Sequence, residues 1–226
     1  MRKNGLVISI DGTAGTGKSS VGKAVAQKLG YGFLSTGELY RALAYKVFEA
    51  KVAAEDGEAV LAIAKQIRFS FVRQPDAVLR MYVNEELLGN KLHLEEVGNV
   101  ASKVSTHREA RAVLTKKMRQ AGMDGGIIME GRDIGTVVFP DAEVKFYLSA
   151  TAQTRAQRRV KQLQEAGETP DYNKILALIE ERDYRDSHRQ ASPLKPAPGA
   201  IIIDTSNLTL EQVVAQVLEK ISNYGA

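Results

Sequence analysis

A glycine-rich segment near the start of the chain constrains its fold and chemistry more than any other feature. It matches the pattern G-x-x-x-x-G-K-[ST] at every defined position, with the sequence Gly12-Thr13-Ala14-Gly15-Thr16-Gly17-Lys18-Ser19. An apolar run at residues 6–10 precedes it, and apolar residues at helical spacing follow it and end before Gly30. A strand, a glycine loop and a helix in this order form a cradle for phosphate, since backbone N–H groups and the helix dipole both favour an anion. The segment therefore predicts a nucleoside triphosphate site.

The predicted loop supplies two side chains with separate tasks. Lys18 is expected to reach the β- and γ-phosphates, and the Ser19 hydroxyl is expected to ligate Mg²⁺. The glycine spacing is G-x-x-G-x-G, which disfavours a dinucleotide fold because that fold uses G-x-G-x-x-G. We predict that the donor nucleotide is held by Gly12, Thr13, Ala14, Gly15, Thr16, Gly17, Lys18, Ser19 and Ser20.

Short apolar runs alternate with helical patterns along the rest of the chain. Five such runs lie at residues 6–10, 33–34, 127–129, 144–148 and 201–203. Continuous apolar strands between helices indicate an α/β fold with a parallel sheet covered on both faces. Residues 68–86 depart from this alternation, because two strand patterns around Pro75-Asp76 predict an antiparallel hairpin in a small insert. The last helix is expected to begin at Thr209, with Gln212 in capping-box spacing.

Composition narrows the class of protein. The 226 residues include no cysteine, which excludes a disulfide framework, a thiolate metal site and a cysteine nucleophile. No apolar run approaches the ~20 residues that a membrane span needs, and the first run is too short for a signal peptide. We expect a cytoplasmic protein with no membrane partner. The net charge of +4 fits an anionic small substrate and a nucleic acid about equally.

Other classes of phosphate-loop protein find little support in the sequence. A regulatory GTPase usually carries Asn-Lys-x-Asp, but the Asn-Lys pairs at positions 90 and 173 are not followed by an aspartate in that position. A nucleic-acid motor is usually larger and carries a run of acidic residues after a strand. Here the run at 127–129 leads instead into Glu130-Gly131-Arg132-Asp133. These absences favour a small kinase that acts on a small anionic acceptor.

Arginines occur where such an acceptor would bind. Arg41 and Arg132 follow predicted strands, and open α/β sheets bind ligands beyond the carboxyl ends of their strands. Two predicted helices carry further arginines on one face each, at positions 155, 158 and 159 and at positions 182, 185 and 189. A guanidinium binds phosphate through two parallel hydrogen bonds and keeps its charge. Any single arginine also fits a solvated surface, so the prediction depends on the set.

Several stretches match one known family. They are residues 10–20, the segment Thr36-Gly37-Glu38-Leu39-Tyr40-Arg41, residues 130–142, residues 155–159 and residues 181–194. With these stretches the chain resembles the bacterial cytidylate kinases over nearly its whole length. The resemblance implies ATP-dependent phosphorylation of CMP and dCMP, with UMP a poorer acceptor. It also implies a phosphate-loop kinase fold with a five-stranded parallel sheet, a helical lid and an enlarged acceptor-binding insert.

The resemblance further implies a division of the chain and a set of site residues. The kinase core is expected at residues 1–59, 106–150 and 195–226, with the insert at about 60–105 and the lid at about 151–194. Catalytic roles are expected for Lys18, Arg132, Arg158 and Arg189. Acceptor binding is expected from Thr36, Arg41, Ser102, Arg111, Arg132, Asp133, Arg182 and Asp186. We expect a monomer that acts on small molecules and binds no nucleic acid.

The implied cytosine contacts have a physical basis. The Asp133 carboxylate can accept a hydrogen bond from the N4 amino group, while Arg111 donates to N3 and O2. Uracil reverses the polarity at both positions and leaves the two side chains mismatched. Two positions depart from the family pattern. Ser35 stands where the family usually has Asp, and Glu130 stands where Asp is common.

Two rival hypotheses stay open at this point. One is another phosphate-loop kinase, for UMP, shikimate or dephospho-coenzyme A. The variants Arg111→Ala and Asp133→Ala would separate it from a CMP kinase, because only cytosine recognition depends on that pair. The other rival is a non-catalytic nucleotide-binding protein or an ATPase that binds nucleic acid through its basic face. The steep salt dependence of phosphate contacts would reveal RNA binding.

Overall fold

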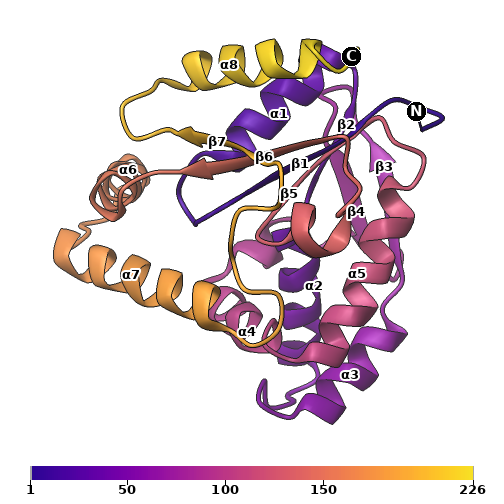
Figure 1. Ribbon diagram of the computed structural model, residues 1–226. Coiled ribbons are helices and arrows are strands. Elements are labelled where there is room, and N and C mark those ends of the chain that lie inside the picture. Colours follow the sequence, from indigo (N-terminus) through magenta and orange to yellow (C-terminus); the bar gives the residue numbers. More distant parts are fainter. Residues whose placement is uncertain (1, 226) are drawn as a thin grey trace.

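A five-stranded parallel sheet forms the centre of the computed structural model, which describes residues 2–225 (Figure 1). Its strand order is β2-β5-β1-β6-β7. The strands are β1 (Val7–Gly12), β2 (Gly32–Ser35), β5 (Ile127–Gly131), β6 (Val144–Ser149) and β7 (Ile201–Asp204). Each strand overlaps one of the five predicted apolar runs, so the predicted sheet is confirmed. Because all five strands are parallel, their carboxyl ends lie along one edge of the sheet.

Helices cover both faces of the sheet (Figure 1). One face carries α1 (Lys18–Leu29) and α8 (Leu210–Ser222), and the other carries α2 (Thr36–Glu49), α3 (Gly57–Gln66), α4 (Glu95–Val104) and α5 (Arg108–Gly122). Alternate side chains of β1 point to opposite faces of the sheet and pack into the two cores between the sheet and its helices. Ile8 and Ile10 belong to the core under α1 and α8, while Val7 belongs to the core under α2 and α5. Burial on both faces explains why the strands appear in the sequence as unbroken apolar runs.

The helix ends follow the sequence signals closely. Helix α1 begins directly after Gly17 and ends at Gly30, whose φ of 66° is the left-handed conformation that commonly terminates a helix. Helix α8 begins with a complete capping box, in which the Thr209 hydroxyl accepts from the Gln212 N–H and the Gln212 side chain accepts from the Thr209 N–H. The predicted capping box is therefore confirmed.

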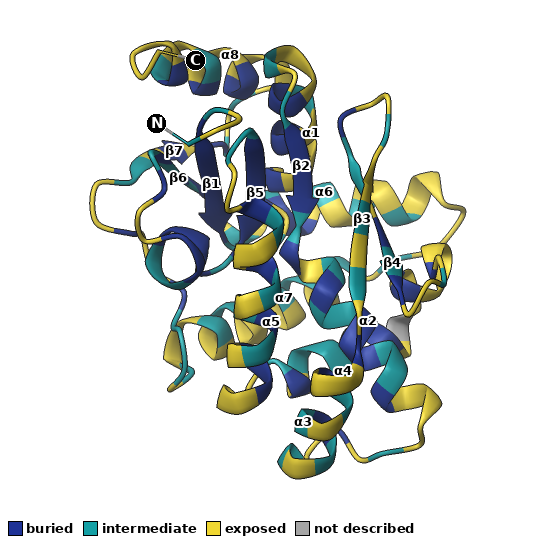
Figure 2. Cartoon of the chain, turned by 90° about the vertical axis from the view of Figure 1, so that its right-hand side faces the viewer, coloured by how far each residue is buried: buried dark blue, intermediate teal, exposed yellow. Residues whose placement is uncertain are grey.

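The predicted hairpin is also present, as the antiparallel pair β3 (Phe69–Arg73) and β4 (Leu79–Val83). It stands beside the sheet next to β2 (Figure 2). The Phe33 N–H donates to the Ala77 carbonyl at 2.9 Å, so the turn of the hairpin covers the otherwise open edge of β2. Met81 and Val83 join the core that contains α2 and α5. The hairpin therefore shares the main core rather than building one of its own.

Two helices project from the carboxyl edge of the sheet, α6 (Ala152–Glu165) and α7 (Tyr172–His188), as the sequence predicts (Figure 1). No side chain of α7 is fully buried within the described part of the chain. The remaining short helices are η1 (Gly89–His93) and η2 (Ile134–Val138). Between residues 2 and 225, none of the helices has both the length and the apolar character to cross a membrane.

Candidate active site

The phosphate loop joins β1 to α1 in the geometry that its glycines require. Gly12, Gly15 and Gly17 all have positive φ angles, of 145°, 80° and 88°. At Gly12 a Cβ atom would lie 2.0 Å from the Leu148 carbonyl oxygen, so this position accepts no larger residue. The loop opens onto the N-terminus of α1, whose first N–H groups have no partner inside the helix. Loop and helix together offer donors to an anion.

Side-chain donors from the loop itself and from outside it hold the carbonyl groups of the loop. The Thr13 carbonyl accepts from the Lys18 ammonium at 2.6 Å and from the Thr16 hydroxyl at 3.0 Å. The Thr205 hydroxyl donates to the Thr16 carbonyl at 3.2 Å. Arg155 donates to the Ala14 carbonyl, also at 3.2 Å. These contacts fix the loop before any nucleotide binds, which lowers the entropy cost of binding.

Lys18 is the most perturbed cation of the loop. Its side chain is only 5% exposed, and burial, reinforced by the nearby Arg132 guanidinium, lowers the pKa of Lys18 to about 7. An incoming triphosphate would reverse this shift because its negative charge favours the ammonium form. Asp11, at the end of β1, is similarly buried. Its carboxylate accepts from the N–H groups of Ile134 and Gly135 at 2.8 Å each, but burial dominates and raises its pKa to about 6.

A cleft rich in arginine lies beside the loop at the carboxyl edge of the sheet. All eight residues predicted to bind the acceptor line it, together with Arg189. Five arginines face three carboxylates there, an excess of two positive charges that suits a phosphate-bearing ligand. The complete lining is Thr36, Gly37, Tyr40, Arg41, Gly98, Ala101, Ser102, Ser105, Arg111, Glu130, Gly131, Arg132, Asp133, Arg182, Asp186 and Arg189.

Arg111 and Asp133 form a buried ion pair in this cleft. Their side chains are 5% and 7% exposed, and Arg111 donates directly to the Asp133 carboxylate. The Tyr40 ring lies against the Arg111 guanidinium, with 5.2 Å between the guanidinium carbon and the ring centroid. A paired donor and acceptor held in one orientation can present a polar edge to a planar base. The structure therefore brings together the two residues predicted to recognise the base.

Arg132 connects the end of β5 to the far helix α7. Its Nε donates to Asp186 at 2.9 Å, and Arg182 lies 4.0 Å from the same carboxylate. Although burial works against it, the Arg132 charge holds the pKa of Asp186 below its ordinary value. Burial and the Arg132 charge both lower the pKa of Arg182. These cations repel one another, and an anion in the cleft would relieve that repulsion.

Ser102, another residue predicted to bind the acceptor, also lines the cleft. Its hydroxyl accepts from the Arg185 guanidinium at 3.1 Å, so Arg185 reaches the cleft from α7. Arg189 donates through Nε to the Ser192 carbonyl at 2.6 Å. A second nitrogen of Arg189 is buried without a partner among the described residues. A buried donor without an acceptor lowers the stability of the fold unless a ligand accepts its hydrogen bond.

Glu130 ends β5 between the loop and the cleft, and its carboxylate oxygen Oε1 accepts two hydroxyl bonds. One comes from Ser19 at 2.8 Å and the other from Ser35 at 2.6 Å. Hydroxyl and carboxylate oxygens are the hard donors that Mg²⁺ prefers. The residues present at the end of β5 and the start of α1 therefore fit a magnesium ion.

Arg158 is the one predicted catalytic residue that belongs neither to the phosphate loop nor to the lining of the arginine-rich cleft. It donates to the carbonyl and hydroxyl of Thr205 and, at 3.5 Å, to the Gly15 carbonyl of the phosphate loop. Arg155, one turn earlier, is 4% exposed and makes a two-pronged ion pair with Asp183 of α7. Arg155 and Arg158 of α6 thus both contact the backbone of the loop.

Sequence reasoning missed the site contacts of three residues. Tyr40 of α2 packs against the core and also lines the cleft against Arg111. Its place within Thr36–Arg41, between two predicted site residues, is a signal that could have found it. Asp11 directly precedes Gly12, the first glycine of the loop, so its place in the sequence could also have identified it as a site residue. Asp183 gives no such signal, because its pairing with Arg155 depends on how α6 and α7 meet.

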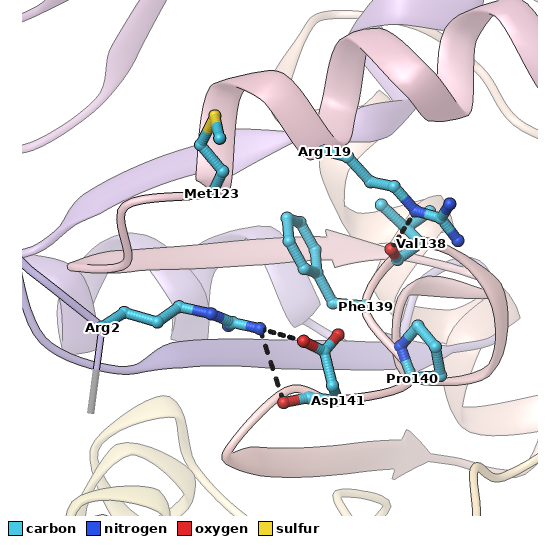
Figure 3. Close-up of a pocket in the computed structure, with 7 residues that line it drawn as sticks. All are labelled: Arg2, Arg119, Met123, Val138, Phe139, Pro140 and Asp141. Atoms are coloured by element: carbon cyan, nitrogen blue, oxygen red, sulfur yellow. Dashed lines mark hydrogen bonds and ion pairs between the residues drawn. The ribbon is translucent and has the colours of Figure 1, made fainter.

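A second cavity, of about 300 Å³, lies near the amino-terminal end of the sheet (Figure 3). Its two arginines are already occupied, since Arg2 pairs with Asp141 and Arg119 donates to the carbonyls of Val137 and Val138. It contains no predicted site residue. The chemistry of the lining therefore favours the arginine-rich cleft as the active site.

Comparison with solved structures supports the fold. The shikimate kinase of Bacteroides thetaiotaomicron matches with a TM-score of 0.51 over 96% of this chain and 98% of its own, at 11% identity. At that identity the likeness concerns the fold alone. It agrees with the predicted phosphate-loop kinase architecture.

Comparison of sequences identifies the family. The family model described as cytidylate kinase matches residues 8–223. The cytidylate kinase of a Marinomonas species is 39% identical over 225 residues, covering 100% of this chain and 99% of its own length. The cytidylate kinase of Pasteurella multocida is also 39% identical, covering 98% of this chain and 97% of its own length. A phosphate loop and an arginine-rich cleft thus occur in a sequence that matches this family from end to end, and the chain belongs to the cytidylate kinase family.

Proposed function

We propose that this protein transfers the γ-phosphoryl group of ATP to the phosphate of CMP or dCMP. The observation that carries the proposal is the arginine-rich cleft, which lies next to the phosphate loop at the same edge of the sheet. An oxygen of the acceptor phosphate attacks the γ-phosphorus, the bond to the β-phosphate oxygen breaks, and the diphosphates of cytidine and adenosine leave. The acceptor oxygen is already an anion, so the site needs no strong general base.

The main obstacle to this reaction is the repulsion between two polyanions. Lys18 and the N–H groups of residues 12–20 bind the donor, and Thr36, Arg41 and Arg132 hold the acceptor phosphate. Support comes from the burial of Thr36 beside Glu130 and from the excess of positive charge in the cleft. Fixed cations stabilise the charge of the transition state without reorganising, which makes them more effective than water.

Base and sugar recognition follow from the remaining side chains of the cleft. Asp133 accepts from the cytosine amino group while Arg111 and Ser102 contact the other polar atoms of the ring. Arg182 and Asp186 hold the sugar, and Arg189 supplies charge near the transferring phosphoryl group. The buried Arg111–Asp133 pair supports this assignment, because a carboxylate acceptor beside a guanidinium donor suits the polar groups of cytosine and mismatches those of uracil.

A magnesium ion, held by Ser19 with Glu130 nearby, completes the donor site. When bound, such an ion neutralises charge on the β- and γ-phosphate oxygens. Ser19, Glu130 and Ser35 then fix the position of the loop through the hydrogen bonds described above.

We also propose the division of the chain stated above, with a core, an insert at about 60–105 and a lid at about 151–194. Arg158 and Arg159 of α6 belong to that lid, which shields the phosphoryl group from water, a competing acceptor. The protein acts as a monomer in the cytoplasm, where both nucleotide substrates occur, and needs no nucleic acid partner.

Turnover with separate acceptors tests the proposal. ADP release is followed in a coupled assay with CMP, dCMP, UMP, AMP and GMP at equal concentration. The proposal expects CMP and dCMP to be used far better than UMP. A preference for AMP or GMP, or transfer to none of the five, would refute it.

A further inference from the structure

Ser35 is the N-cap residue of α2 but does not cap it. A serine at this position normally accepts a hydrogen bond from an N–H of the first turn. Within the described residues of α2, no backbone N–H donates to the Ser35 hydroxyl. The hydroxyl instead donates to the Glu130 carboxylate at 2.6 Å. A residue that gives up its usual local role at a site edge marks a functional constraint.

The oxygen that accepts from Ser35 also accepts from the phosphate loop. Glu130 Oε1 lies 2.8 Å from the Ser19 hydroxyl, and Glu130 as a whole is 7% exposed. The next residue after Ser35 is tied to the same place, because the Thr36 hydroxyl donates to the Glu130 backbone carbonyl at 2.8 Å. Three hydroxyls from two loops therefore converge on one residue.

Strand order explains why Glu130 can serve both loops. Strand β5 lies between β1, which leads into the phosphate loop, and β2, which leads into α2. Glu130 pairs in register with Ile10 on one side and with Ser35 on the other. The phosphate loop follows β1, and the acceptor loop, Ser35 and Thr36, lies at the end of β2. These two strands are not neighbours in the sheet, so the two loops are not connected through a shared strand pair. Their connection passes through the Glu130 side chain of β5, the strand that lies between them.

We propose that Ser35 is a positioning residue that couples the two substrate sites, because its bond to Glu130 ties the acceptor loop to the Ser19 hydroxyl of the phosphate loop. The inference rests on the proposed function, since it takes the acceptor to be CMP. A donor nucleotide fixes Ser19, and thereby fixes the Glu130 carboxylate that holds Ser35, while Thr36 is held by the backbone carbonyl of the same residue. Occupancy of either site then favours binding at the other, and linkage makes the effect equal in both directions.

Binding measurements without turnover test the coupling. The CMP dissociation constant is measured by titration calorimetry with and without Mg²⁺ and a non-hydrolysable ATP analogue. In the unaltered protein we expect the analogue to tighten CMP binding about tenfold, within the usual range of such couplings. Ser35→Ala should abolish the difference. Ser35→Thr keeps the hydroxyl and should retain it, and the KM for CMP at saturating ATP should follow the same order.

Thr209→Ala provides a matched control at another N-cap. The Thr209 hydroxyl caps α8 and takes no part in the hydrogen bonds to Glu130, so its loss should lower the melting temperature and leave the coupling unchanged. Ser35→Ala removes no cap bond and should lower the melting temperature less. This contrast separates a positioning role from a merely structural one.

Each other result overturns the inference. Coupling that survives in Ser35→Ala, or that disappears in Ser35→Thr as well, would show that the hydroxyl does not transmit it. A melting temperature that falls as far with Ser35→Ala as with Thr209→Ala would assign Ser35 to helix stability. CMP binding that the analogue leaves unchanged in the unaltered protein removes the coupling but leaves the proposed function intact. No CMP binding at all contradicts the proposed function itself.

Discussion

The phosphate loop and the arginine-rich cleft are neighbours in space but are assembled in opposite ways. The loop is one continuous segment, and its conformation follows from three glycines that no other residue could replace without strain. The cleft takes side chains from α2, α4, α5, α7 and the end of β5, spread between positions 36 and 189. The loop binds a group common to every nucleoside triphosphate, whereas the cleft must distinguish one base from others. Generic recognition is local in the chain, and specific recognition depends on the tertiary fold.

Removing the Lys18 side chain tests the role of the phosphate loop and should have the largest effect on catalysis. We expect Lys18→Ala to lower kcat/KM about 10³-fold, the order found when a preorganised charge-stabilising donor is lost. The coupled assay measures it for CMP. Lys23→Ala, an exposed position on the same helix, should remain within about twofold of the unaltered enzyme because exposed charges contribute little. Activity of Lys18→Ala within tenfold of the original would contradict the loop's role.

Breaking the Arg111–Asp133 ion pair tests the role of the arginine-rich cleft. Asp133→Ala leaves a buried cation without its partner, which should destabilise the protein by about 3–5 kcal/mol. It should also lower kcat/KM for CMP about 10²-fold while changing the value for UMP much less. Chemical denaturation and the coupled assay measure the two effects.

A paired replacement separates folding from recognition at this position. Arg111→Met combined with Asp133→Leu replaces both charges by apolar side chains, so most of the lost stability should return. The preference for CMP should not return with it. If the double variant still favoured CMP over UMP, the base would have to be recognised elsewhere in the cleft.

The pH dependence of ATP-analogue binding tests the phosphate loop separately from the cleft, because it reports the protonation of Lys18 alone. The pKa of Lys18 is lowered to about 7 in the free protein, and a bound triphosphate raises it again. Above pH 7 binding must therefore take up a proton, so the affinity for the ATP analogue should fall by up to about tenfold per pH unit. Calorimetry in buffers of different ionisation enthalpy detects the proton. Lys18→Arg stays charged and should bind with little dependence on pH.

The smallest expected effect concerns the contact between the loop and α7. Asp183→Ala removes the carboxylate that holds Arg155 against the Ala14 carbonyl. Since Asp183 is partly exposed, the loss should be about 1 kcal/mol, which raises the KM for ATP about fivefold. The KM for CMP should change less. Glu180→Ala, an exposed neighbour on α7, serves as the control. Equal changes in both KM values would mean that Asp183 supports the two sites alike.

The sequence predicted the fold well because its signals are local. Apolar runs, a Pro-Asp turn and a capping box each arise within a few residues, and the sheet, the hairpin and the start of α8 all match them. The cleft lining could be named only through resemblance to a family, since Arg132 and Asp186 meet across 54 positions. The pairing of Arg155 with Asp183 and the convergence of Ser19 and Ser35 on Glu130 could not be predicted. Helical periodicity shows which side chains share a face but not what that face meets.

The absence of any fully buried side chain within the described helix α7 has a thermodynamic consequence. Moving such a helix exposes little apolar surface, so the hydrophobic effect contributes less to its attachment than it does for the core helices. Ion pairs to Arg155 and Arg132 supply much of its attachment, and both lie partly open to solvent. Dissolved ions weaken contacts of that kind. For the lid proposed above, we therefore expect the rate of opening, and with it the release of products, to depend strongly on ionic strength.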